Sequence, residues 1–151
     1  MGRRQARRLA FQMIYQIDVG NSNVEDVEMI WSEYLSAADR ELNLRKEKNG
    51  TLDDEDEAFL KTLVRGVIDN KEEIDALLDN ELKSWKIERV FSVDKNLLRL
   101  AVYEFLYLDE VPVKVTMNEA IEMAKKFGSE ESPSFVNGVL ANLKDVVKTT
   151  T

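Results

Sequence analysis

The stretch SVDKNLLRLAVYEFLYL, from Ser92 to Leu108, contains no glycine and no proline and predicts one long helix. Apolar residues recur at helical spacing in this stretch and through nearly the whole chain, which only six glycines and two prolines interrupt. The sequence therefore predicts an all-α fold of about seven helices.

Four helices are expected before this stretch. The first covers about residues 3–19 and stops at Gly20, and the second covers about residues 24–38. The acidic run 53–57 opens a third helix, because acidic side chains suit the positive end of a helix dipole. The fourth helix follows Asn70.

Two helices are expected after it. The sequence Thr116-Met117-Asn118-Glu119 has the pattern of a capping box, so it predicts the start of the sixth helix, and Gly128 predicts its end. Ser132 followed by Pro133 predicts the start of the last helix. The run Val111–Val115 alternates like a strand without an evident partner, and we expect an extended connector there.

The chain is long enough for a single domain, 1–151, built from two helical subdomains. The polar stretch 40–54 contains an Asn-Gly pair and is the best candidate for a boundary, which divides the chain into halves of about 1–48 and 52–148.

The charge is unevenly distributed along the chain. The net charge is -8, and four arginines are the only charged side chains before Asp18 at neutral pH. The remainder therefore carries 17 basic and 29 acidic residues, a net charge of -12. An acidic body repels nucleic acid, so polyanion binding is expected only at the basic N-terminal end and only with strong salt dependence.

Composition also excludes several kinds of chemistry. The chain has no cysteine and no histidine, so it has no disulfide, no thiolate nucleophile and no histidine base or metal ligand. The basic N-terminus is not followed by an apolar signal core, and no apolar run approaches the roughly 20 residues that span a bilayer. We therefore expect a cytoplasmic protein that does not enter a membrane.

The first helix predicts an RNA-binding face. At 100° per residue, a core-facing stripe of Ala6, Leu9, Ala10, Met13, Ile14 and Ile17 lies opposite Arg4, Arg8, Phe11 and Tyr15. Arginine matches phosphate oxygens and aromatic rings stack on unpaired bases. Arg3 and Arg7 flank this face, and Gln12 adds an amide. The alternative is that Phe11 and Tyr15 pack against the second helix and that the arginines are solvated.

Six motifs in order resemble the NusB family of bacterial transcription antitermination factors over almost the whole chain. They are Arg3-Arg4-Gln5-Ala6-Arg7 with Gln12 and Tyr15; Trp85–Arg89; Val93-Asp94-Lys95 leading to Leu98–Glu104; Val111-Pro112-Val113-Lys114-Val115; Asn118–Gly128; and Phe135-Val136-Asn137-Gly138-Val139-Leu140.

The resemblance implies a NusB-like fold without enzymatic activity, cofactor, metal or small-molecule substrate. It implies binding of boxA, a short single-stranded RNA element, together with the ribosomal small-subunit protein NusE. The pair nucleates an antitermination complex on RNA polymerase, chiefly in ribosomal RNA operons. By this resemblance, the RNA contacts include Arg3, Arg4 and Arg7, and Arg8 is a candidate replacement for the arginine that relatives often have at the position of Gln5.

The resemblance also implies contacts in the second half of the chain. RNA is expected at Phe135 and Asn137, although Phe135 has a core position as its alternative. NusE is expected at Asp94 and Tyr15, although Asp94 at the start of a helix has dipole compensation as its alternative. An acidic surface suits this partner, because ribosomal proteins are usually basic.

The sequence admits three other interpretations. The acidic run 53–57 lacks the glycine and the terminal glutamate of a calcium loop, so a solvated helix start is preferred. Related helical domains occur attached to RNA methyltransferases, but the chain has no glycine-rich cofactor loop and no strand–helix alternation. A helical scaffold whose arginines bind an acidic protein remains as an alternative, and discrimination between boxA and scrambled RNA separates it from the adaptor.

Overall fold

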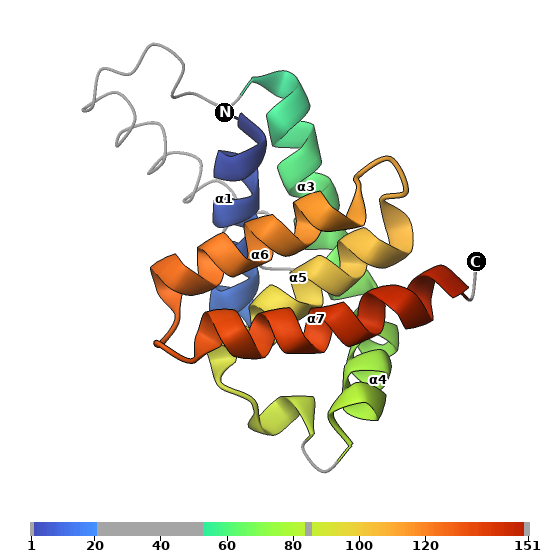
Figure 1. The fold of residues 1–151 in the computed structure, drawn as a ribbon. Coiled ribbons are helices and arrows are strands. Elements are labelled where there is room, and N and C mark those ends of the chain that lie inside the picture. The colour runs from blue at the N-terminus through green and yellow to red at the C-terminus, as the bar shows by residue number, and fades with distance from the viewer. Residues whose placement is uncertain (1, 21–52, 84–85, 150–151) are drawn as a thin grey trace. The chain divides into compact units, whose positions relative to one another are not determined.

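The computed structural model describes residues 2–20, 53–83 and 86–149, and every regular element within those ranges is helical. The prediction of an all-α chain is confirmed. The helix expected at about 24–38 lies outside the described residues. The elements, drawn in Figure 1, are α1 (Gly2–Val19), α3 (Asp54–Asp69), α4 (Lys71–Leu82), the 3-10 helix η2 (Ile87–Arg89), α5 (Ser92–Tyr107), α6 (Val113–Phe127) and α7 (Ser132–Thr149).

The chain divides into two compact units, Met1–Ile68 and Asp69–Thr151. The first unit holds α1 and α3 up to its last residue, and the second unit holds the remaining described helices. The boundary expected at about 48–52 falls outside the described residues. The third helix was expected in the C-terminal half, but it groups with the N-terminal unit.

In the first unit, α3 begins as its acidic run predicts. Four acids occupy its first turn, and the Asp56 backbone N–H donates to Asp53 Oδ1 at 2.8 Å. This bond satisfies one of the free N–H groups at the start of the helix, and the acids complement the helix dipole. Leu60, Leu63 and Val64 are fully buried and form the core side of the helix.

In the second unit, α5 is the central helix and contacts α4, α6 and α7. It is buried around nearly its whole circumference, including all residues from Asn96 to Phe105. A helix that is buried on nearly all sides is typical of a central core element. This burial explains why Ser92–Leu108 dominates the fold of the second unit. Two of its buried polar side chains have partners in neighbouring helices: Arg99 donates to Asp75 of α4, and Glu104 accepts from Thr116 of α6.

The predicted start of α6 is wrong. The helix begins at Val113, so Thr116 lies inside it, and Thr116 Oγ1 donates to Glu104 Oε1 of α5 at 3.0 Å. The connector expected at Val111–Val115 is helical from Val113 onward. Pro112 stands at the N-cap with extended backbone, and packing against α5 overrides the strand preference of the valines.

The end of α6 at Gly128 is predicted correctly, and the physical reason is that a side chain does not fit at this position. Gly128 follows the last helical residue with φ -98° and ψ -167°, which is extended backbone that any residue adopts. A Cβ at Gly128 would overlap the Ser132 side chain and lie 2.9 Å from the Ala124 carbonyl oxygen. The Ser129 backbone N–H donates to Ser132 Oγ at 2.9 Å, which closes the tight connection to α7.

No helix in the described part of the chain is both long enough and apolar enough to cross a membrane.

Candidate functional site

Arg3 of α1 is held by α3 in the first unit. Its Nη1 donates to the Glu55 backbone oxygen at 3.1 Å and lies 3.4 Å from Asp56 Oδ1, while its guanidinium carbon lies 4.3 Å from the centre of the Phe59 ring. Burial raises the pKa of Asp56 and the nearby Asp53 adds to this effect, whereas Arg3 lowers it. The side chain of Arg3 is still 50% exposed, so part of it remains accessible.

Arg7 lies against the same ring and is almost entirely buried. Its guanidinium carbon is 5.1 Å from the centre of the Phe59 ring, and the residue is only 5% exposed. A guanidinium over an aromatic face is attracted by the negative ring quadrupole. The sequence pattern does not indicate Phe59 as a partner, because Arg7 and Phe59 are 52 positions apart in the chain.

The accessible residues of the predicted RNA face follow one side of α1. Arg4 is exposed, and Arg8, Gln12 and Tyr15 are half-buried. Because Arg4, Arg8 and Gln12 are spaced four residues apart, they lie one above another on the helix. This face combines two arginines, an amide and an aromatic ring.

Phe11 does not belong to the accessible face, and its predicted exposure is wrong. It is 3% exposed, and its ring centre lies 6.0 Å from that of Tyr15 with the ring planes tilted by 45°. The buried residues of α1 run from Ala6 through Ile14 and cover about 200° of the helix at 100° per residue. A helical wheel cannot show how much of a helix its neighbours cover.

Asp94 lies in the first turn of α5 in the second unit and is 7% exposed. Its Oδ1 is buried and has no hydrogen-bond partner within the described residues. Burial raises the pKa of Asp94, and the hydroxyl of Ser132 opposes this rise. A buried acceptor without a partner costs free energy, so a donor from another molecule would be favoured there.

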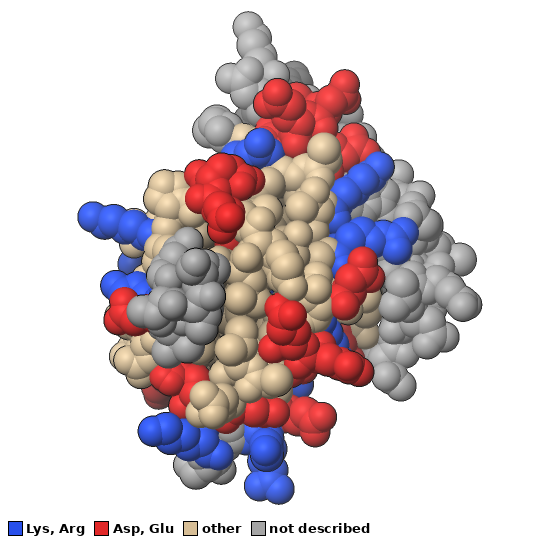
Figure 2. All heavy atoms as spheres, turned by 90° about the vertical axis from the view of Figure 1, so that its right-hand side faces the viewer, with Lys and Arg blue, Asp and Glu red and all other residues tan. Residues whose placement is uncertain are grey.

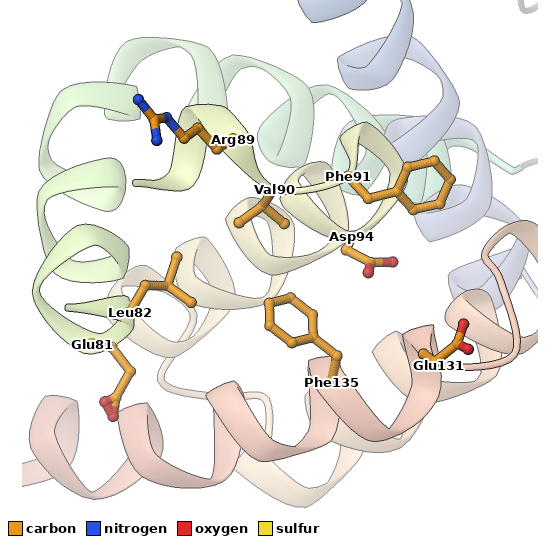
Figure 3. A pocket seen from close by; sticks show the side chains of 8 residues that line it. All are labelled: Glu81, Leu82, Arg89, Val90, Phe91, Asp94, Glu131 and Phe135. Atoms are coloured by element: carbon orange, nitrogen blue, oxygen red, sulfur yellow. The ribbon is translucent and has the colours of Figure 1, made fainter. Parts of the chain in front are cut away.

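Asp94 lines a pocket of about 500 Å³. Figure 3 shows its lining from α4, η2, α5 and α7, with the Phe135 ring reaching from α7 toward Val90 and Leu82. Phe91 and Phe135 remain 54% and 36% exposed. The pocket thus combines apolar walls with a buried carboxylate. The complete lining is Glu81, Leu82, Arg89, Val90, Phe91, Asp94, Glu131 and Phe135.

Phe135 and Asn137 lie on different sides of α7. Two residues correspond to about 200° around a helix, and Asn137 accordingly lines a separate hollow of about 540 Å³ between α6 and α7. The two residues that the sequence grouped as one RNA contact therefore belong to two different surfaces. The second hollow is lined by Val113, Lys114, Met117, Asn118, Ile121, Asn137, Lys144 and Asp145.

The surface charge agrees with the acidic composition. Figure 2 shows groups of acidic side chains over the face in view, with lysine and arginine side chains among them. Within the described residues, no group of three or more acidic side chains has the arrangement of a metal site. The run 53–57 instead supplies Asp53 as a cap and Asp56 as a partner for Arg3.

A sequence model of the NusB family matches residues 4–145. The transcription antitermination protein NusB of Bacillus mycoides (strain KBAB4) is 45% identical over 149 residues, covering 97% of this chain and 100% of that protein.

Solved structures show the same relationship. NusB of T. maritima is similar with a TM-score of 0.79 and 33% identity, over 95% of this chain and 90% of that one. A crystal structure of antitermination factors NusB and NusE in complex with dsRNA is similar with a TM-score of 0.76 and 26% identity, over 96% of this chain and 97% of that one. The match extends over nearly the full length in sequence and in fold, and the chain belongs to the NusB family.

Proposed function

We propose that this chain is a transcription antitermination factor without enzymatic activity. It binds single-stranded boxA RNA together with NusE and assembles with them on RNA polymerase, mainly in ribosomal RNA operons. The name of the B. mycoides relative supports the antitermination role, and the similar structure of NusB with NusE and dsRNA supports the two partners. The observation that carries the proposal is the accessible face of Arg4, Arg8, Gln12 and Tyr15 on α1.

On this face, the guanidinium groups of Arg4 and Arg8 bind phosphate oxygens, and Tyr15 stacks on an unpaired base. Gln12 lies between them and donates to or accepts from a base edge. An arginine fork makes two parallel hydrogen bonds to a phosphate, so two arginines one turn apart fit successive phosphates of a single strand.

Arg3 and Arg7 act differently from Arg4 and Arg8. Arg3 is half exposed, and its guanidinium binds a phosphate in place of its ion pair with Asp56. Arg7 is too buried for direct contact and contributes its positive charge to the local potential. Their common contact with Phe59 also holds the start of α1 against α3, which positions the accessible arginines.

NusE binds at the pocket around Asp94 and also contacts Tyr15. A lysine or arginine side chain of NusE donates to Asp94 Oδ1, and the apolar walls take the stem of that side chain. Phe135 stacks on the RNA at the mouth of the same pocket. RNA and NusE therefore meet beside one another.

The test of RNA binding is a titration of labelled boxA RNA and a scrambled RNA in the presence of NusE over a salt series. The variant Arg4→Ala plus Arg8→Ala removes two phosphate contacts, so the slope of log affinity against log salt falls by about 1.4, at roughly 0.7 per contact on a single strand. If the two proteins have equal affinity at 1 M salt, this change in slope lowers the affinity of the variant about 25-fold at 0.1 M salt.

The matched control is Lys61→Ala plus Lys71→Ala, which removes the same charge from two exposed positions on α3 and α4. It leaves the affinity and the slope close to those of the unsubstituted protein. Equal slopes for the arginine variant and this control, with no preference for boxA, would mean that the basic end serves another partner.

A further inference from the structure

The hollow between α6 and α7 is not used by the contacts of the proposed function. Of the residues that line it, only Asn137 was expected from the sequence to contact RNA. All eight residues that line it belong to the second unit, and none of them lines the pocket around Asp94. Its volume of about 540 Å³ is similar to that of the Asp94 pocket, but its chemistry is different.

The α6 side supplies an apolar floor. Val113, Met117 and Ile121 are half-buried and spaced four residues apart, so they form one stripe along the helix. Methionine adapts its shape to its contacts and packs well against aromatic rings. The floor therefore suits a flat ring such as a nucleobase.

The rim supplies positive charge from both helices. Lys114 of α6 is exposed and Lys144 of α7 is half-buried, and neither makes an ion pair with any side chain that the structure describes. By contrast, Lys125 and Lys61 pair with Glu122 and Glu57. The lining also holds one acid, Asp145, so two lysines against one carboxylate leave the hollow with a net positive charge. In a chain of net charge -8, this local excess favours an anionic occupant.

The rim also carries two amides and the start of a helix. Asn118 of α6 and Asn137 of α7 are exposed, and an amide both donates and accepts hydrogen bonds, as a base edge requires. The helix α6 begins at Val113 without an acid in its first turn, so its dipole adds to the positive potential of the lysines.

The surface of α7 between the two hollows lets another chain approach closely. Gly138 is exposed, and a Cβ at this position would meet nothing within 4 Å. Glycine is less favourable than alanine inside a helix, and no contact of the described residues requires it here. On the helix it lies between Phe135 and Asn137, on the arc that joins the two hollows.

We propose that the α6–α7 groove binds a nucleotide of the RNA strand, with its phosphate between Lys114 and Lys144 and its base on the floor, where Asn118 and Asn137 contact the base edge. This inference rests on the proposed function and extends its RNA path across α7. An acidic peptide would satisfy the lysines alone, but the apolar floor and the two exposed amides favour a nucleotide.

The test uses the full chain with NusE and a labelled RNA that carries boxA with four added nucleotides on each side. The variant Lys114→Ala plus Lys144→Ala is expected to lower the affinity about 25-fold at 0.1 M salt and to lower the salt slope by about 1.4. The variant Asn118→Ala plus Asn137→Ala carries no charge change, so it lowers the affinity by roughly tenfold and leaves the slope unchanged. The double variant of Lys61 and Lys71 serves again as the charge-matched control.

RNA affinity and slope that match the control for both groove variants would overturn the groove proposal. This failure is distinguishable from a failure of the proposed function, because the Arg4 and Arg8 variant is measured in parallel. If that variant loses affinity while the groove variants do not, the RNA path ends before the α6–α7 groove. Circular dichroism melting of each variant verifies that the folded helices are retained.

Discussion

At the scale of single residues, Asp94 is a proposed binding group that lowers the stability of the free protein. The carboxylate is buried at the start of α5, one of its oxygens has no partner within the described residues, and burial raises its pKa. The helix dipole favours a negative charge there, which offsets part of that cost. In the proposed complex a donor from NusE would satisfy the free oxygen, so the stability that is lost in the free protein would be recovered on binding.

Asp94→Asn tests this idea through the pH dependence of stability. Because the pKa of Asp94 is raised in the folded state, its stabilising contribution is complete below the unfolded value near 3.8 and is lost as the pH rises through the folded value. As the pH is lowered from neutral toward 4, the free energy of unfolding of the unsubstituted protein therefore increases relative to that of Asp94→Asn. Urea unfolding of both proteins at several pH values measures the gap, and a pH-independent gap contradicts the assignment.

At the scale of elements, an ion pair ties α4 to α5. Arg99 is 3% exposed, its Nε and Nη2 donate to the two carboxylate oxygens of Asp75 at 2.8 and 2.9 Å, and its Nη1 donates to Asn96 Oδ1 at 3.1 Å. Two parallel bonds fix the relative position of the side chains more strictly than one. Because α5 also carries Asp94, this pair helps to hold the wall of the pocket.

Arg99→Ala is expected to lower the free energy of unfolding by about 3 kcal/mol, since it leaves the carboxylate of Asp75 partly buried without its partner. Arg99→Lys keeps the charge but loses the two-pronged geometry, so its loss is smaller. Lys71→Ala on the exposed side of α4 is the control and stays within about 0.5 kcal/mol of the unsubstituted protein. A loss for Arg99→Ala no larger than that of this control, in urea unfolding, would show that the pair contributes little.

At the scale of the whole molecule, charge and partners are linked. The basic end carries four of the 21 basic residues, so RNA binding by α1 alone opposes the repulsion of an acidic body. Under the proposed function, NusE would neutralise part of that body on binding, because ribosomal proteins are usually basic. The Asp94 pocket also places the proposed contacts of NusE and RNA side by side, since Asp94 and Phe135 line it together.

We therefore expect positive coupling between the two partners. NusE raises the affinity for boxA RNA by about fivefold or more, the lower end of usual coupling between sites. Asp94→Asn reduces this effect and leaves the affinity for RNA alone unchanged. The measurement is an RNA titration with and without saturating NusE, and equal affinities in the two titrations would refute the coupling.

Much of the fold was predictable from local pattern. The extents of α1 and α5, the acidic start of α3 and the end of α6 at Gly128 each depend on a few neighbouring residues. The start of α6 was not predictable in this way. Thr116 has the pattern of a cap, but it forms a hydrogen bond to Glu104, which lies on another helix.

The candidate site was predictable as a list of residues and not as an arrangement. The motifs indicated arginines on α1, a carboxylate at Asp94 and an aromatic ring at Phe135. They did not indicate that Arg7 is buried against Phe59, or that Asn137 faces a different hollow from Phe135. The sequence did not predict Lys114 and Lys144 as parts of one site, because they line one hollow only where α6 packs on α7.

The sequence by itself determined the helical class, the separation of a basic end from an acidic body, and the resemblance to the NusB family. Spacing and composition are sufficient for these, because they depend on residues near one another in the chain. Only the tertiary structure decided which arginines are accessible, which ring is covered and which side chains share a hollow. A repeat along a helix gives the direction of a side chain around its axis, but burial depends on what packs against that side, and such neighbours come from distant parts of the chain.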